Sequence, residues 1–317
     1  MKRRDFLIGI AAGSALGSWM ATDGYTALQA AHRTRKPAPH PVDKRARIAI
    51  SSWSFHKYFQ STREKEFNLP GSMLVLLDFP EMMVDRYKVH NFEFVAPHFA
   101  STEATYLREL KSHLVRTYSR LVNIPVDIEE IDTAGGLSDP DVRVRDRAIE
   151  ASKKWIDIAH DLGAGAVRCD PGKIDPSDLT PTVASYKKLV SYGRSKGIRV
   201  TIENHGGVGS EHPQELVKLL REVGSDSIGA LPDFGNFPDE TTRDKGLSLL
   251  FPFARGVCHA KGLGFDASGT ETQYDFAKCM AIAKKAGYKG VFSVEYEGPA
   301  DPYDGVQKVV NELERYL

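Results

Sequence analysis

Eight short segments rich in β-branched and aromatic residues alternate along this chain with segments whose apolar residues recur at helical spacing. Eight strand–helix units in about 270 residues predict a (β/α)8 TIM barrel rather than an open doubly wound sheet, which usually has fewer strands and a glycine-rich phosphate turn. Helices are clearest over 141–163 and 181–197, where each segment ends in a glycine suited to a helix C-terminus. The strand candidates are residues 47–55, 91–99, 119–128, 166–172, 198–205, 227–235, 254–262 and 290–298.

The N-terminal segment has the pattern of an export signal. Lys2, Arg3 and Arg4 precede a mostly apolar run over residues 6–21. This run has the length of a signal-peptide core, and it is too short and too rich in Gly and Ser to predict a stable membrane span. The arginine pair, followed by Asp-Phe-Leu, resembles a twin-arginine export signal, which carries folded proteins across the inner membrane. A general secretion signal or an uncleaved anchor is the alternative.

These features predict three regions and a location. We expect residues 1–30 to be a twin-arginine-type signal peptide, residues 31–46 to be a linker rich in proline and charge, and residues 47–317 to be one barrel domain. The expected location is the periplasm, or another exported location reached through the twin-arginine (Tat) translocon, which would be a partner during export. An oligomer is compatible with this sequence.

Charge balance and cysteine usage exclude some classes of protein. The 42 basic residues equal the 42 acidic ones, so the formal net charge is zero and the chain lacks the basic footprint of a nucleic-acid-binding protein. The hydrophobic content of 41% is sufficient for a full core. Cys169, Cys258 and Cys279 are odd in number and lack metal-type spacing, which predicts three buried thiols rather than a disulfide framework or a cysteine–zinc site.

Polar side chains follow the apolar residues of the fifth predicted strand, in the stretch VTIENHGG, and place Glu203 and His205 at its end. In a TIM barrel the carboxyl ends of the strands form the mouth of the active site. The next three strands end in the same way, because LPDFGN contains Asp233, VCHAKG contains His259 and FSVEYEG contains Glu295. Side chains alternate along a strand, so Glu203 and His205 share the inward parity.

Three carboxylates and one imidazole at a shared rim suit one divalent ion. Mn²⁺ is the preferred ion, with Mg²⁺, Co²⁺ and Zn²⁺ as competitors, because hard oxygen donors dominate and one nitrogen is present. Taken singly, each acid is more often a helix cap or an ion-pair partner, and a lone histidine is more often structural. Three clustered acids without a cation would repel one another, whereas a divalent ion supplies the compensating charge.

The segments IENHGG, LPDFGN, CHAKG and SVEYEG together resemble the xylose isomerase-like barrel superfamily of sugar phosphate isomerases and epimerases, which also includes ketose 3-epimerases, inosose dehydratases and endonuclease IV. The resemblance covers roughly residues 47–317 and is strongest over the last four strands. It implies that Glu203, Asp233, His259 and Glu295 bind the metal, and that Glu203 and Glu295 are also the catalytic acid/base pair.

The activity that this resemblance implies is isomerisation or epimerisation of a sugar or keto-sugar. A metal that holds a carbonyl and a neighbouring hydroxyl oxygen stabilises an enediolate, so that a carboxylate can remove the adjacent proton. Loss of a β-hydroxyl from the same enediolate would make the protein a dehydratase or lyase of a keto-polyol. A non-catalytic sugar-binding barrel is a further alternative. A DNA-repair endonuclease is disfavoured by the export signal and the balanced charge.

Other polar residues near strand ends are candidate contacts to a small carbohydrate. Many sugar epimerases of this family carry His three residues after the sixth-strand Asp, whereas this chain has an Asn, which can hydrogen-bond a hydroxyl but cannot be a cation near neutral pH. This departure separates the chain from the ketohexose-epimerase pattern. For each candidate a structural role is the alternative. The predicted substrate contacts are His205, Asn236, Lys261, His98, Arg168 and Trp53.

Overall fold

The computed structural model describes residues 43–63, 73–132 and 135–317 of the protein. The predicted signal peptide and residues 31–42 of the predicted linker lie outside these residues. The compact unit begins at Asp43, inside the predicted linker, where Lys44–Arg47 forms a short 3-10 helix, η1. The Arg45 guanidinium holds this turn on the barrel, because it lies 2.5 Å from a carboxylate oxygen of Glu314 and donates to the backbone oxygen of Tyr87.

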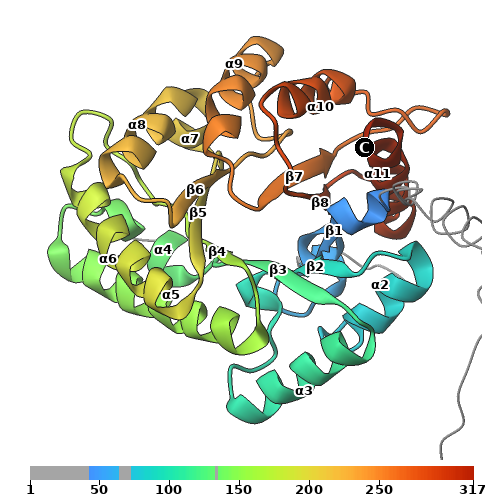
Figure 1. Cartoon of the computed structure of the whole chain (residues 1–317), viewed down its shortest axis with the longest axis horizontal. Coiled ribbons are helices and arrows are strands. Elements are labelled where there is room, and N and C mark those ends of the chain that lie inside the picture. Colours follow the sequence, from blue (N-terminus) through green and yellow to red (C-terminus); the bar gives the residue numbers. More distant parts are fainter. Residues whose placement is uncertain (1–42, 64–72, 133–134) are drawn as a thin grey trace, which may run out of the picture. The chain divides into compact units, whose positions relative to one another are not determined.

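Eight parallel strands form the curled sheet at the centre of this unit, so the predicted TIM barrel is confirmed (Figure 1). The sheet order is β6-β5-β4-β3-β2-β1-β8-β7. Each strand lies within one predicted segment. The strands are β1 (Ile48–Ser51), β2 (Asn91–Glu93), β3 (Arg120–Pro125), β4 (Ala166–Arg168), β5 (Arg199–Glu203), β6 (Ile228–Leu231), β7 (Val257–Gly262) and β8 (Val291–Tyr296).

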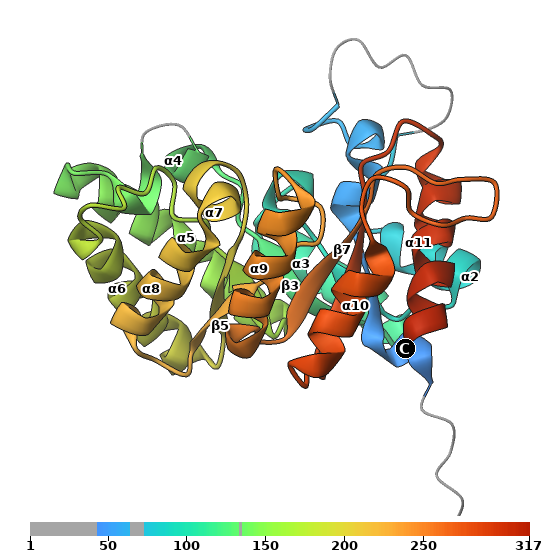
Figure 2. The same cartoon turned by 90° about the horizontal axis from the view of Figure 1, so that it is seen from above.

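Helices surround these strands in Figure 1, and the short helices α4 and α7 lie at one edge of the barrel in Figure 2. Both short helices directly follow strands, β3 and β5, so this edge is the carboxyl-terminal mouth. The helices are α2 (Phe79–Tyr87), α3 (Ala104–Arg116), α4 (Glu129–Asp132), α5 (Val142–Leu162), α6 (Thr180–Lys196), α7 (Gly207–Glu211), α8 (Pro213–Val223), α9 (Glu240–Leu250), α10 (Phe276–Lys285) and α11 (Pro302–Tyr316).

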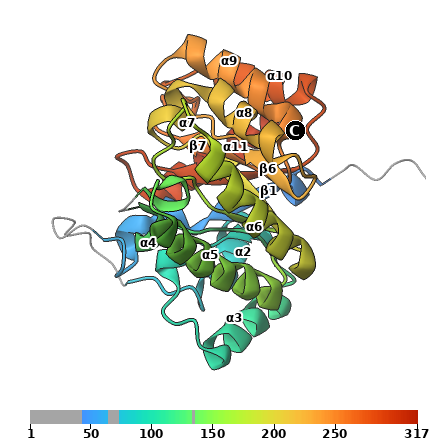
Figure 3. The ribbon, with the colours of Figure 1, turned by 90° about the vertical axis from the view of Figure 1, so that its left-hand side faces the viewer.

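The two best-defined helix predictions are confirmed as α5 and α6, which pack side by side (Figure 3). Asp141 begins α5 by accepting a hydrogen bond from the backbone N–H of Arg143. Both helices end at a left-handed glycine, Gly163 with φ +77° and Gly197 with φ +71°. In the described residues no helix is long and apolar enough to cross a membrane.

Several strands are shorter than predicted because the chain turns into 3-10 helices at the mouth. After β1 the Ser51 hydroxyl accepts a hydrogen bond from the backbone N–H of Trp53, and residues Ser52–Tyr58 form η2. After β2 residues Ala96–His98 form η3. The other 3-10 helices are η4 (Gly136–Ser138) and η5 (Phe251–Phe253). All three cysteines are buried free thiols, as predicted.

The barrel closes between β6 and β7 at the level of the mouth. Isolated parallel bridges join Ala230 to Ala254 and Asp233 to His259. The backbone N–H of His259 donates to the carbonyl oxygen of Pro232 over 2.9 Å, and the next bond runs from the N–H of Phe234 to the carbonyl oxygen of His259 over 3.1 Å. Two of the predicted metal ligands are therefore fixed by the backbone bonds that close the barrel.

Candidate metal centre

The four residues predicted to bind a metal lie together at the carboxyl ends of β5 to β8. Each offers one ligand atom, and these four atoms lie within 4.8 Å of one another. Glu203 is the last residue of β5, His259 and Glu295 lie in β7 and β8, and Asp233 follows β6. All four side chains are almost completely buried. Adjacent parallel strands end at the same edge of the barrel, which is why residues so distant in sequence converge.

The imidazole of His259 lies at the centre of this group. Its Nδ1 atom is 3.2 Å from Oε1 of Glu203 and 3.5 Å from both Oδ2 of Asp233 and Oε2 of Glu295. Its Nε2 atom points the other way and lies 2.9 Å from Oε1 of Glu93, the last residue of β2. One ring nitrogen therefore faces three carboxylates, while the other is held by a fourth.

Glu93 fixes the orientation of the His259 ring. Burial raises the pKa of Glu93, but His259 and a hydrogen bond from Asn123 outweigh burial and hold that pKa below its usual range. An ionised carboxylate can only accept, so Nε2 carries the hydrogen and Nδ1 is left facing the three acids. A metal-binding histidine commonly has this arrangement, with its second ring nitrogen donating to a carboxylate.

The donor set fits a divalent cation. Oε2 of Glu203 and Oδ2 of Asp233 are buried oxygens that accept no well-aligned hydrogen bond and contact protein cations only as ion pairs. Burial lowers the pKa of His259, yet Glu295, Glu93 and Glu203 more than reverse this effect and raise it well above its usual range. The acids therefore create a strong local demand for positive charge, which three oxygen donors and one nitrogen donor would satisfy with one ion.

Two protein cations meet this demand only in part. The Lys261 ammonium lies 2.8 Å from Glu295 and 3.4 Å from Asp233, and it also pairs with Glu297 at 3.2 Å. Arg168, at the end of β4, places its Nε atom 3.1 Å from Oε2 of Glu203. The same guanidinium binds Asp127 and Asp170, each at 2.6 Å. Each cation is thus shared among several carboxylates, and the acids outnumber the cations.

The two predicted acid/base residues have different electrostatic surroundings. Burial raises the pKa of Glu295 to about 7, although His259 and Lys261 act in the opposite direction. Burial also acts to raise the pKa of Glu203, but His259 and Arg168 outweigh it, and the net pKa lies well below the usual range. Before any cation binds, one carboxylate is ionised near neutral pH and the other is close to its midpoint.

Four of the predicted substrate contacts line a cavity of about 230 Å³ above this group. Trp53, Arg168, His205 and Lys261 lie in its wall together with Glu203 and Glu295. The indole N–H of Trp53 donates to Glu297 over 2.6 Å, which holds the ring at the rim. His205 donates from Nδ1 to Asp170, and this hydrogen bond, more than the nearby Glu203 charge, raises the pKa of His205 to about 9.

The other two predicted contacts have hydrogen-bond partners within the protein. The side-chain amide of Asn236 donates to Oε1 of Glu203 over 3.0 Å, so this residue supports a candidate ligand. His98 is buried in η3 at the mouth, with Nδ1 at 2.9 Å from the hydroxyl of Ser52 and Nε2 at 2.9 Å from the hydroxyl of Thr62. Its ring also stacks on Phe59 at 3.8 Å. Neither side chain lines the cavity described above.

Sequence reasoning missed three carboxylates and one amide on or directly after the strands. Glu93 and Asn123 belong to β2 and β3, and Asp127 and Glu297 follow β3 and β8. A detectable signal existed for Glu93, which stands between the apolar residues Phe92 and Phe94 in a predicted strand. A buried charged residue in such a position needs a partner, and His259 is that partner.

An eight-stranded barrel with three carboxylates and an imidazole converging at its carboxyl-terminal mouth defines a TIM-barrel protein with a candidate metal centre. A family model described as xylose isomerase-like TIM barrel matches residues 84–316. The chain therefore belongs to the xylose isomerase-like TIM barrel family, as the sequence resemblance implied.

Several solved structures share this fold. The D-allulose 3-epimerase from Methylomonas sp. is 15% identical, with 86% of this chain and 98% of that chain covered and a TM-score of 0.66. A xylose isomerase-like TIM barrel protein from Mycobacterium smegmatis in complex with magnesium is 15% identical (85% and 94% covered, TM-score 0.59). The probable 3-DHS dehydratase from Bacillus anthracis is 12% identical (84% and 98% covered, TM-score 0.61). No curated protein matches the chain significantly.

Replacing Glu93 tests its role in holding His259. We expect Glu93→Gln to weaken Mn²⁺ binding by about 10-fold or more. A neutral amide does not hold the hydrogen on Nε2 of His259 as firmly as the negatively charged carboxylate does. Titration calorimetry of the metal-free protein measures this. Glu297→Gln is the matched control, since Glu297 contacts Lys261 and Trp53 instead of His259. A folded Glu93→Gln protein with unchanged affinity would contradict the assignment.

His98 predicts a pH dependence of stability. Burial, with a smaller contribution from His56, lowers its pKa to about 3, whereas the unfolded chain has a value of about 6.5. Between about pH 3 and pH 6.5 the unfolded state binds a proton at His98 that the folded state does not bind. The stabilising contribution of neutral His98 is therefore complete above about pH 6.5 and is lost as the pH falls below that value. When the pH is lowered from 7 to 5, we expect the free energy of unfolding of the native protein to fall by about 2 kcal/mol more than that of His98→Gln. Urea unfolding measures both values. Parallel losses in the two proteins would contradict this.

Proposed function

We propose that this protein is a divalent-metal-dependent isomerase or epimerase of a sugar or keto-sugar. The observation that carries the proposal is the buried convergence of Glu203, Asp233, His259 and Glu295 on one point at the barrel mouth. When bound there, a divalent ion would supply electrostatic stabilisation of an enediolate formed from a carbonyl and its neighbouring hydroxyl. Mn²⁺ is the proposed ion, and the magnesium complex of the Mycobacterium smegmatis protein supports Mg²⁺ as a competitor.

Glu203 and Glu295 are the proposed acid/base pair. They extend from β5 and β8, on two sides of His259, with carboxylate oxygens 3.2 and 3.5 Å from its Nδ1 atom. A sugar carbon held between them would present one face to each carboxylate. One residue could then remove the proton beside the carbonyl while the other returns a proton from the opposite face, which inverts that carbon.

The cations of the mouth hold this pair in place. Arg168 lies against Glu203, and Lys261 lies against Glu295. Each cation stabilises the ionised form of its carboxylate and contacts it in the cavity wall. Trp53 forms an apolar wall on which the less polar face of a sugar ring can lie, and Glu297 fixes its indole.

A dehydratase is the second candidate. The shared fold with the probable 3-DHS dehydratase from Bacillus anthracis favours it. The same base could start both reactions, because both begin with removal of a proton beside a carbonyl. The outcomes then differ, since a dehydratase expels a β-hydroxyl as water whereas an epimerase reprotonates the carbon.

Deuterium uptake tests the proposal directly. We expect the Mn²⁺-loaded protein, incubated in D₂O with a panel of ketoses and keto-sugars, to introduce one deuterium without loss of water, as measured by mass spectrometry and NMR. Glu203→Gln and Glu295→Gln should each lower the exchange rate by about 10²- to 10⁴-fold, because each removes a proton-transfer group. Chelation of the metal should abolish exchange.

Glu312→Gln is the matched control for these variants. Glu312 is a buried glutamate outside the mouth, and a glutamine there can still accept the hydrogen bond from the backbone N–H of Glu271. Its exchange rate should equal that of the native protein. Loss of water from the sugar would establish the dehydratase instead, and an inert metal-loaded protein across the whole panel would refute both reactions.

We also propose export through the twin-arginine pathway, on the basis of residues outside the described part of the chain. In a bacterium with that translocon, Arg3→Lys combined with Arg4→Lys should reduce the periplasmic protein about 10-fold or more, because the receptor reads the arginine pair. Lys2→Gln, which leaves the pair intact, is the control. Fractionation and immunoblotting measure the distribution. Undiminished export of the double variant would indicate a general secretion signal.

A further inference from the structure

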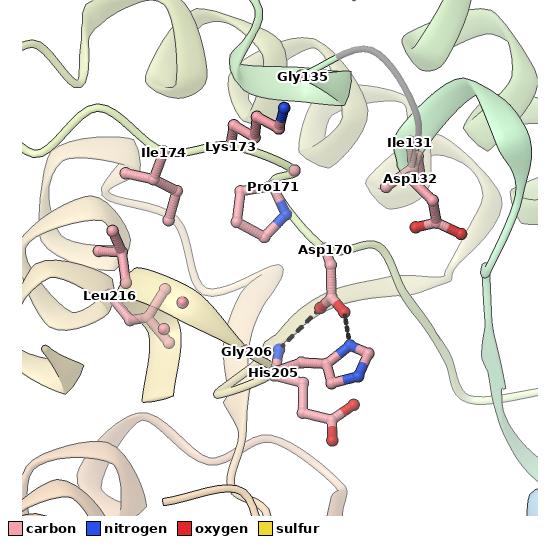
Figure 4. A pocket seen from close by; sticks show the side chains of 15 residues that line it. Ile131, Asp132, Gly135, Asp170, Pro171, Lys173, Ile174, His205, Gly206 and Leu216 are labelled. Carbon is pink, nitrogen blue, oxygen red and sulfur yellow. Dashed lines mark hydrogen bonds and ion pairs between the residues drawn. The ribbon is translucent and has the colours of Figure 1, made fainter. Parts of the chain in front are cut away.

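A second cavity, of about 390 Å³, adjoins the cavity above the candidate metal centre (Figure 4). The two cavities share three wall residues, Asp132, Glu203 and His205. The side chain of His205 is 55% exposed and anchored to Asp170, so it stands at the junction of the two spaces. The reaction proposed above uses only the smaller cavity and leaves the larger one, here called the outer chamber, without a role.

The outer chamber has an apolar and a polar part. Ile174 and Leu216 lie together in its wall, while Asp170 and His205 lie at its base, linked by their hydrogen bond (Figure 4). The adjoining segment 206–209 contains three glycines, and an added Cβ at Gly206 or Gly207 would meet no atom within 4 Å. Glycine at three of these four positions leaves only Val208 to project a side chain from this segment of the wall.

Size argues that the substrate extends into this chamber. Alone, the 230 Å³ cavity is smaller than the range of about 300–1,000 Å³ that is usual for small-molecule sites. Together with the 390 Å³ of the outer chamber, the continuous space falls in the middle of that range. The mixed apolar and polar wall suits a second sugar ring or a substituent of similar size, which has both kinds of surface.

Charge argues that this substrate is neutral. Arg168 is already paired with Asp127, Asp170 and Glu203, and Lys261 is paired with three other carboxylates. Lys173 lines the outer chamber opposite Asp132 and Asp170. Even with His205 counted as a cation, six acids outnumber four basic side chains in the described walls of the two cavities. A phosphate or carboxylate group would therefore meet acids that the wall does not fully compensate.

We propose that the substrate is a neutral two-ring sugar, in which the reacting ketose or keto-sugar ring lies beside Trp53 and a second ring-sized substituent occupies the outer chamber. This inference rests on the proposed function for the identity of the reacting ring. The chamber itself is defined by described residues that lie outside the candidate metal ligands, apart from the shared Glu203.

Matched substrate pairs and one chamber-filling variant test this inference. One pair is a free ketohexose and the disaccharide in which the same ketohexose carries a second ring at C4. Another is a sugar with a ring ketone and its aryl glycoside, which tells whether the second group must be a sugar. For the Mn²⁺-loaded protein, deuterium uptake gives kcat/KM, and calorimetry gives Kd for the same compounds.

We expect the two-ring member of a pair to be preferred by about 10-fold or more. Ile174→Trp, which fills the outer chamber, should remove most of this preference and change the one-ring values less than about twofold. Ile282→Trp is the control, because Ile282 is equally a partly buried isoleucine but lies on α10. Circular dichroism verifies that both variants fold.

Each outcome decides the inference. Equal or better use of the one-ring sugar, equal losses for both members in Ile174→Trp, or tighter binding of a phosphorylated ketohexose would overturn it. Absence of deuterium uptake from every sugar would refute the proposed function alone. In that case the Kd values from calorimetry still decide the inference about the outer chamber. Tighter binding of the two-ring sugars that is lost in Ile174→Trp supports the inference, and equal binding of one-ring and two-ring sugars refutes it.

Discussion

The burial of three carboxylates around Nδ1 of His259 is the interaction on which this mouth depends. Like charges at such short range repel strongly where water is excluded, so the arrangement requires a compensating cation. The backbone bridge between Asp233 and His259 also closes the barrel. Fold and site are therefore coupled, because the strands that complete the cylinder bring the acids together, and a cation that binds those acids would stabilise the closure.

Glu93 connects this group to the opposite side of the barrel. It reaches from β2 across the interior to the Nε2 atom of His259, and it is held there by donors from Asn123 and Ser293. A buried carboxylate is costly unless it is fully paired, and this one has three partners. Its position gives the imidazole one orientation, with Nδ1 facing the acids, so the barrel interior and not only the rim defines the site.

Much of the barrel was predictable because local patterns determine it. The eight strands and the glycine-ended helices follow from alternation and capping, and the convergence of Glu203, Asp233, His259 and Glu295 follows from parallel strands ending at one rim. Pairings across the interior were not predictable, since they depend on which side chains meet. His98 illustrates this limit, because its strand-end position suggested a substrate contact, whereas Ser52, Thr62 and Phe59 enclose it.

Asn236 shows how the surroundings of the four acids shape the mouth. Its amide donates to Oε1 of Glu203, and its backbone N–H, with that of Gly235, donates to Oδ1 of Asp233. The other oxygens of the two acids, Oε2 and Oδ2, accept no well-aligned hydrogen bond and contact protein cations only as ion pairs. Because the Asn236 side chain is engaged with Glu203, polar recognition within the smaller cavity falls to residues that do line it, among them Arg168 and His205. These two lie on the side that leads to the outer chamber, so the proposed proton transfer at the acids and the proposed selection by substrate size involve neighbouring, connected parts of one wall.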